Sequence, residues 1–233
     1  MNIITNNLIK KYGNFQLDLP NLQINSGEIF GLVGNNGAGK TTFLRLCLDL
    51  IEAKEGIVLS GELNVAKNED WKNYTGAYLD QGFLIDFLTP EEYFDFVASL
   101  HKMSEEEIET SLNRFDSFFN NNILGKGKYI RELSTGNKNK VGITAAMIFY
   151  PKVLFLDEPF ANLDPTSRQI LSNLLTEMNQ KHGTTMIISS HDLDNVVDVC
   201  TRIAILEDGK IVEDNEKTES TYQELKEYFE VKV

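Results

Sequence analysis

The stretch from Gly34 to Thr41 constrains this chain more than any other part of the sequence. It reads GNNGAGKT and fits the pattern G-x-x-x-x-G-K-[ST] of a phosphate-binding loop. The apolar run Glu28–Val33 before it predicts a buried strand, and Phe43–Leu48 after it predicts a helix. A chance glycine-rich turn is the alternative, with odds on the order of one in a hundred from average glycine usage. The flanking elements lower these odds, so we expect a strand, a loop and a helix that bind phosphate.

Each part of this loop has a physical task in phosphate binding. Glycines let the backbone curl so that successive N–H groups face phosphate oxygens, and the start of the helix adds a partial positive charge. The Lys40 side chain is expected to reach the β- and γ-phosphates of a nucleotide, and the Thr41 hydroxyl to ligate Mg²⁺. The predicted nucleotide contacts are Gly34, Asn35, Asn36, Gly37, Ala38, Gly39, Lys40, Thr41 and Thr42.

Composition and charge limit the class of protein. The chain of 233 residues is long enough for one large α/β domain, and its hydrophobic content of 42% is ordinary for a globular protein. Its apolar runs are far shorter than the ~18 residues of a membrane span, and no signal peptide is visible. A formal net charge of −13 argues against nucleic acid or anionic lipid as the main partner. We therefore expect a cytoplasmic protein, with Cys47 and Cys200 as buried free thiols.

Strand patterns occur in two parts of the chain, with helix patterns between them. An antiparallel pair is predicted within 3–19, and further strands at 28–33, 56–61, 75–79, 153–158, 184–189, 202–206 and 210–212. Helices are predicted at 90–101, 105–119, 135–149, 164–182 and 222–229. Thr89 and Ser104, each followed three residues later by Glu, are expected to start helices as capping boxes.

This order of elements predicts the fold class. We expect an α/β fold of the P-loop NTPase (RecA-like) kind, in which a parallel sheet is joined by an N-terminal antiparallel β subdomain and an inserted α-helical subdomain. Residues 1–233 would form a single ATPase domain. Within it, 1–85 and 151–233 would form the catalytic core with the antiparallel subdomain, and 86–150 the helical subdomain.

Polar residues follow three of the predicted core strands. Gln81 follows one strand, Asp157 and Glu158 end the next, and His191 follows a third. Because parallel α/β sheets bind ligands at the carboxyl ends of their strands, we expect these residues to converge beside the phosphate loop. Asp157 suits a Mg²⁺ ligand, and Glu158 is placed to polarise an attacking water. The alternatives are a polar turn residue at Gln81 and a helix cap at the two acids.

The ordered set of sites resembles the ATP-binding subunit of an ABC transporter over nearly the whole chain. The matching segments are Tyr12 (adenine-stacking aromatic), Gly34–Thr42 (Walker A), Gln81 (Q-loop), Leu133–Asn137 (signature), Leu156–Pro159 (Walker B with the catalytic glutamate), Ala161–Asp164 (D-loop) and His191 (switch histidine). The phosphate loop alone is shared with many NTPases, whereas the ordered set is specific. For Tyr12, a packed surface aromatic is the alternative to stacking on adenine.

The resemblance implies roles for the matched residues. The implied catalytic residues are Glu158, His191, Lys40 and Gln81, and the implied Mg²⁺ ligands are Thr41, Gln81 and Asp157. Tyr12, Ser134, Gly136 and Asp164 join the phosphate loop as implied nucleotide contacts. In this family the signature loop binds the γ-phosphate of the ATP that the opposite subunit holds, and the Q-loop glutamine touches both Mg²⁺ and the membrane partner.

The signature loop departs from the family's usual Leu-Ser-Gly-Gly-Gln. Thr135 and Asn137 replace a glycine and the glutamine, while Ser134 and Gly136 remain. Ser134 can still donate its hydroxyl, and the N–H groups that start the following helix can still face an anion. We therefore expect the departure to affect hydrolysis more than binding. Lys138 and Lys140 would add positive charge near the same phosphate or form a solvated basic face.

The resemblance further implies an ATP-driven dimer coupled to transport. Two ATPase subunits, in a homo- or heterodimer, would close head to tail over ATP and Mg²⁺. A separate transmembrane permease would receive the motion and hold the subunit peripherally on the inner face of the cell membrane. The size of the chain resembles separate-subunit exporters. The alternatives are a soluble ABC-type ATPase in an assembly or regulatory role, and a binding-only module with a dead site.

Overall fold

The computed structural model describes residues 1–218, so the helix predicted at 222–229 lies outside the described residues. The strands are β1 (Ile3–Tyr12), β2 (Phe15–Leu19), β3 (Gln23–Ile24), β4 (Ile29–Val33), β5 (Glu55–Ser60), β6 (Leu63–Asn64), β7 (Thr75–Tyr78), β8 (Val153–Asp157), β9 (Thr185–Ser190), β10 (Arg202–Glu207) and β11 (Lys210–Glu216). The α-helices are α1 (Lys40–Cys47), α2 (Pro90–Leu100), α3 (Glu105–Asn113), α4 (Asp116–Phe119), α5 (Thr135–Met147), α6 (Pro165–His182) and α7 (Asp194–Val197). Short 3₁₀ helices occupy Asp70–Tyr74, Gln81–Phe83 and Ile130–Glu132.

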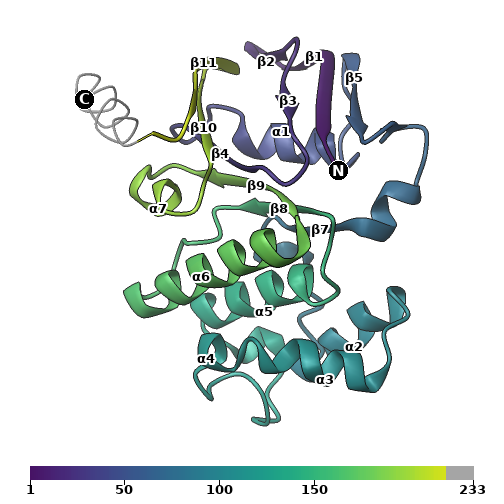
Figure 1. The fold of residues 1–233 in the computed structure, drawn as a ribbon, viewed down its shortest axis with the longest axis vertical. Coiled ribbons are helices and arrows are strands. Elements are labelled where there is room, and N and C mark those ends of the chain that lie inside the picture. Colours follow the sequence, from purple (N-terminus) through teal and green to yellow (C-terminus); the bar gives the residue numbers. More distant parts are fainter. Residues whose placement is uncertain (219–233) are drawn as a thin grey trace.

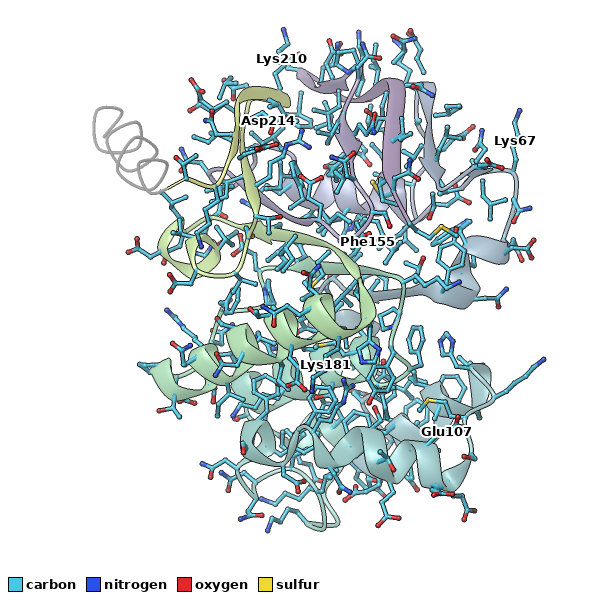
Figure 2. All side chains as sticks on the ribbon, in the orientation of Figure 1. Lys67, Glu107, Phe155, Lys181, Lys210 and Asp214 are labelled. Atoms are coloured by element: carbon cyan, nitrogen blue, oxygen red, sulfur yellow. The ribbon has the colours of Figure 1, made fainter. Side chains whose placement is uncertain are left out.

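A sheet in the order β11-β10-β4-β9-β8-β7 forms the centre of the described chain. β10, β4, β9, β8 and β7 run parallel, and β11 pairs antiparallel with β10 at the edge. β4, β8 and β9 are buried along their whole length, which explains why their central residues are apolar without alternation. Phe155 of β8 lies inside the molecule, whereas Lys67 and Lys210 project from its surface (Figure 2). The predicted α/β architecture with a parallel sheet is confirmed.

A second, antiparallel sheet packs with α1 on one side of the central sheet (Figure 1). Its strands follow the order β2-β1-β5-β6, and β3 pairs with β1. Leu8 and Leu17 of this sheet, Phe30 of β4 and Phe43 of α1 belong to one buried cluster, so the two sheets and the helix share a core. The same cluster contains Cys47, and burial raises the pKa of its thiol. This sheet is the predicted N-terminal antiparallel part.

Helices α2 to α5 lie between β7 and β8 in the sequence and on the opposite side of the central sheet, beside α6 (Figure 1). Both predicted capping boxes are present, at Thr89 and Ser104. The single helix predicted over 105–119 is wrong, because the chain breaks between α3 and α4. Nε of Arg114 donates to the Ser111 carbonyl, and the N–H of Phe115 bonds Leu112 instead, so the α-helical hydrogen-bond ladder stops there.

Candidate functional site

The predicted phosphate loop joins β4 to α1 as the sequence indicates. Gly37 and Gly39 have φ of 87° and 112°, a backbone conformation that disfavours residues with a side chain. A Cβ at Gly34 would lie 2.2 Å from the backbone oxygen of Leu206, so the close approach of β10 also requires glycine there. Gly39 is the N-cap of α1 and supplies no side-chain acceptor, which leaves the first N–H groups of the helix for an anion.

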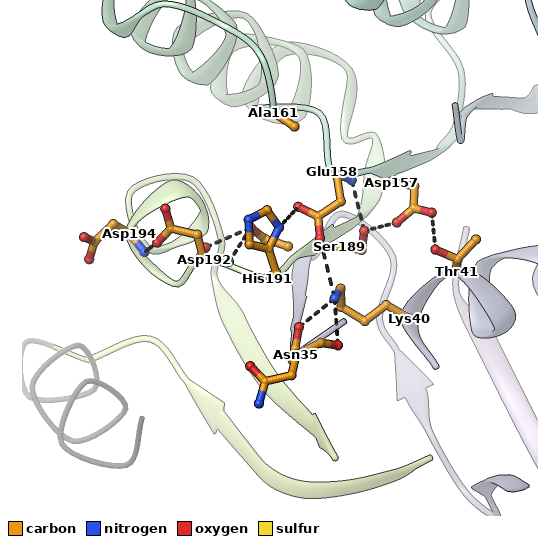
Figure 3. Close-up of polar contacts among 12 residues, drawn as sticks. Asn35, Lys40, Thr41, Asp157, Glu158, Ala161, Ser189, His191, Asp192 and Asp194 are labelled. Atoms are coloured by element: carbon orange, nitrogen blue, oxygen red, sulfur yellow. Dashed lines mark hydrogen bonds and ion pairs between the residues drawn. The ribbon is translucent and has the colours of Figure 1, made fainter. Parts of the chain in front are cut away.

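The Lys40 side chain folds back and bonds the first residues of this loop. Nζ donates to the backbone oxygens of Gly34 at 2.6 Å and Asn35 at 3.3 Å, and it lies 3.5 Å from Oε1 of Glu158 (Figure 3). The side chain is buried, so its charge is screened little by solvent. A phosphate at this position would offer Nζ anionic acceptors in place of neutral backbone oxygens, which makes stronger hydrogen bonds.

Asp157 connects the end of β8 to the phosphate loop. Thr41 Oγ1 donates to Asp157 Oδ2 at 2.5 Å, and Ser189 Oγ donates to Asp157 Oδ1 (Figure 3). Hydroxyl and carboxylate oxygens are the ligands that Mg²⁺ prefers, so this donor set fits the predicted metal. Residues 1–218 contain no group of three or more His, Cys, Asp or Glu side chains that could hold a metal alone. In nucleotide sites Mg²⁺ is usually bound by one or two carboxylates together with phosphate oxygens and waters, which fits this donor set.

Glu158 lies between Lys40 and the predicted switch histidine. Its Oε1 faces Nζ of Lys40, while its Oε2 lies 2.8 Å from Nδ1 of His191, which follows β9. The backbone N–H of Glu158 donates to both the Oγ and the carbonyl of Ser189, and its φ of 50° turns the chain out of the strand. The carboxylate is thus held from two sides at the edge of the sheet, where a base that activates water would have to stand.

Other predicted site residues do not join this cluster through any contact in the described structure. Gln81 Nε2 bonds Thr135 O and Asn139 Oδ1 on α5, at 3.2 and 2.7 Å. Asp164 caps α6, and hydrogen bonds from Ser167 lower the pKa of its carboxyl. The nucleotide roles of both residues stay predictions.

The predicted adenine platform and the signature loop also stand apart from the acidic cluster. Tyr12 ends β1 as a residue that is 49% exposed, and Lys10 Nζ lies 5.0 Å from its ring centre. Ser134 is the N-cap of α5 and accepts from Asn137 N, and Ser134 and Thr135 are exposed at this helix start. Lys140 is buried 5.2 Å from the Phe118 ring, and burial lowers its pKa, so the solvated basic face proposed for this residue is wrong.

The sequence interpretation missed two polar residues of the site. Ser189 lies opposite Asp157 in the parallel register of β8 and β9 and fixes its carboxylate, a placement that the neighbouring strand ends could have indicated. Asn139 bonds Gln81, Tyr78 and the Ala161 carbonyl. The available signal was a polar residue at the start of the mostly apolar buried part of α5.

Comparisons with known proteins show which family this chain belongs to. The family model described as ABC transporter matches residues 17–161. An uncharacterized ABC transporter ATP-binding protein of Methanocaldococcus jannaschii is 36% identical, over 88% of this chain and 74% of its own. A methionine import ATP-binding protein of Clostridioides difficile is 32% identical, over 89% of this chain and 66% of its own.

Solved structures are similar over nearly the whole chain. One described as the ATP binding subunit of an ABC transporter has a TM-score of 0.87 at 26% identity and covers 100% of both chains. A bacterial ABC transporter cassette described as dimeric has a TM-score of 0.81 at 25% identity, over 92% of this chain and 98% of its own. The chain spans 54% and 61% of the length of two other curated relatives. The matched family model and the identity to these relatives show that the chain belongs to the ABC transporter family, as one of its nucleotide-binding ATPase subunits.

Proposed function

We propose that this chain binds ATP with Mg²⁺ on the phosphate loop and hydrolyses it to drive a transporter. The observation that carries the proposal is the position of Glu158. Its carboxylate is held between Lys40 and His191, and it directly follows Asp157, the carboxylate that fits a Mg²⁺ ligand. Release of inorganic phosphate from ATP and Mg²⁺ by the purified chain tests the catalytic part. A chain that binds ATP but releases no phosphate would favour the binding-only alternative.

In the proposed reaction Lys40 exchanges the Gly34 and Asn35 carbonyls for phosphate oxygens. Thr41 and Asp157 would hold the metal, with the Gln81 amide oxygen as a further ligand, and when bound Mg²⁺ would neutralise charge that develops on the phosphates. Glu158 accepts the proton of a water that attacks the γ-phosphate in line, while His191 fixes the other oxygen of that carboxylate. The bond between the γ-phosphorus and the bridging oxygen breaks, so ADP leaves with that oxygen and inorganic phosphate is formed. The positive charge of Lys40 stabilises the transferred group.

A second subunit would complete each site in this proposal. The Ser134 and Thr135 side chains are exposed at the start of α5, so they are free to face an ATP held by another copy. The N–H groups at this helix start can receive the γ-phosphate. A similar cassette described as dimeric supports such an arrangement.

The unusual signature predicts weak closure of that dimer. The Thr135 methyl would crowd a phosphate where the family has glycine, and a strained contact typically costs ~1 kcal/mol. The isolated chain should be mostly monomeric with low basal turnover, and Thr135→Gly with Asn137→Gln should raise dimerisation and turnover together by about fivefold. Gel filtration with ATP and phosphate release measure the two effects. Thr166→Gly, the same change in the first turn of α6, is the control; a double variant no faster than wild type would show that the altered signature is neutral.

A separate membrane permease is the second proposed partner. Among the helices of residues 1–218, none is both long and apolar enough to cross a membrane. A pocket of about 350 Å³ is lined by residues on both sides of Gln81 in the sequence, and its mostly apolar lining includes Leu50, Leu79, Phe83 and Tyr93. Phe83 exposes 53% of its surface there, and such a pocket fits an apolar segment of a partner. The exporter expected from the sequence gains no support, because the methionine relative is named an import protein; the proposal therefore carries no direction of transport.

The permease proposal predicts that a charged side chain in the pocket at Phe83 weakens binding of the membrane partner. Phe83→Asp should reduce co-purification of the chain with a membrane protein by about tenfold or more, since a buried aromatic anchor is worth ~2 kcal/mol or more. ATP affinity should be unchanged. Ile57→Asp on β5, an equally drastic change at another exposed apolar residue, is the matched control. If wild type co-purifies only with soluble proteins, the soluble ABC-type ATPase is the better reading.

A further inference from the structure

Asn139 joins three segments of the proposed site through one side chain. Its Oδ1 accepts from Tyr78 OH at 2.7 Å and from Gln81 Nε2 at 2.7 Å, and its Nδ2 donates to Ala161 O at 2.8 Å. Only 4% of the residue is exposed, so water competes little for these bonds. The end of β7, the helix that carries the signature loop and the chain after Glu158 therefore meet at a single amide.

The network fixes which way the amide of Gln81 points. A backbone carbonyl can only accept, so Ala161 O requires Nδ2 of Asn139 on its side and places Oδ1 on the side of Gln81. Oδ1 can also only accept, so Gln81 must offer Nε2 to it. The Thr135 carbonyl, 3.2 Å from the same Nε2, makes the same demand. Both hydrogen bonds that Gln81 makes in the described part of the chain thus use the nitrogen, which leaves Oε1 for another partner.

The Ala161 carbonyl, which accepts the hydrogen bond from Asn139, is held in place by tight backbone packing. A Cβ on Gly136 would lie 2.7 Å from the Asn162 carbonyl, so the start of α5 touches the chain next to Ala161. Asn162 itself has a φ of 58°, a turn that fixes the direction of the Ala161 carbonyl before it. Ala161 also donates its N–H to the carbonyl of Glu158, so the segment is tied back to the proposed base.

We propose that Asn139 is a positioning residue that presents the Gln81 amide oxygen to Mg²⁺. This inference rests on the proposed function. Mg²⁺ takes oxygen ligands and not amide nitrogen, so a Gln81 with its amide reversed cannot bind it. Gln81 follows β7, whose Tyr78 pairs with Leu156 of β8, and the next residue of β8 is Asp157. Gln81 and Asp157 therefore stand at the carboxyl ends of neighbouring strands, where a metal could contact both. Residues that orient a ligand are expected to affect metal affinity.

The test is the Mg²⁺ dependence of nucleotide binding, measured by calorimetry with a non-hydrolysable ATP analogue. Mg²⁺ is expected to raise the affinity of the wild-type chain for the nucleotide. In Asn139→Leu this increase should be about tenfold smaller, while the affinity measured without Mg²⁺ should be unchanged. Tyr78→Phe removes another hydrogen bond to the same Oδ1 without touching Gln81, so it should keep the wild-type gain. A loss of affinity that is equal with and without Mg²⁺ would overturn the inference, because it would mean that Asn139 only supports the fold.

A double-mutant cycle separates an effect through Gln81 from any other. Gln81→Ala should reduce the Mg²⁺ gain as Asn139→Leu does, and the two changes together should cost no more than one alone. Additive losses, or a wild-type Mg²⁺ gain in a folded Asn139→Leu, would overturn the inference. Asn139→Ser replaces Asn139→Leu in the same cycle if the leucine variant does not fold. If the wild-type chain itself binds no nucleotide, the proposed function fails, and that result is distinct from nucleotide binding with an unaltered Mg²⁺ gain.

Discussion

Replacing Glu158 by Gln should slow ATP hydrolysis by about 10²-fold or more and leave binding of ATP with Mg²⁺ intact. The amide has the same shape as the carboxylate, so it can still accept a hydrogen bond from His191 at the position of Oε2. It cannot take a proton from the attacking water, because a neutral amide is a very weak base. The ion pair with Lys40 is lost as well, and this frees Nζ for the phosphate.

The same variant should accumulate the closed dimer when ATP is present. If hydrolysis opens the dimer, a subunit that cannot hydrolyse stays closed, and the species should elute at twice the monomer mass on gel filtration. Glu177→Gln is the control, because Glu177 pairs with Lys181 on the exposed face of α6 away from the site. Normal phosphate release by Glu158→Gln would show that another group activates the water.

The sequence could predict the parts of the fold that short patterns determine. The phosphate loop, β4 and α1 follow from adjacent residues, and both capping boxes need only a Thr or Ser and a Glu three positions later. The strand predicted at 210–212 is shorter than the observed β11, Lys210–Glu216, because its length depends on a contact with another strand. β11 continues to Glu216 because Arg202 of β10 holds Asp214 with two bonds of 2.6 Å, a contact between strands that the polar sequence of β11 does not reveal.

In the candidate site, too, local sequence patterns predicted the residues at the strand ends but not the contacts between residues far apart in the sequence. Asp157, Glu158 and His191 were predictable because they follow apolar strands, and the parallel register then brings them together. The partner of Gln81 was not predictable, because Asn139 is 58 positions away and lies on a helix whose direction only the tertiary packing fixes. A sequence pattern can therefore name a ligand, while its orientation depends on residues that meet it in the folded chain.

Lys40→Ala should weaken ATP binding by about tenfold to a hundredfold, which is the loss expected for one charge-assisted hydrogen bond to phosphate worth ~1.5–3 kcal/mol. The effect has two sources in this structure. Alanine removes the contact to phosphate, and it also removes the bonds from Nζ to Gly34 O and Asn35 O, which connect the two ends of the loop. Calorimetric titration with ATP measures the affinity, and a thermal melt shows whether the change is confined to the site.

A matched variant distinguishes the position of Lys40 from its charge. Lys181→Ala changes the net charge by the same amount on the exposed face of α6, so long-range attraction of ATP should fall equally in the two variants. Only the Lys40 variant should lose affinity that persists at high salt, because a buried contact is screened far less than an exposed charge. Equal affinities of the two variants at high salt would mean that the phosphates do not lie against Lys40, and the proposed nucleotide site would be wrong at its centre.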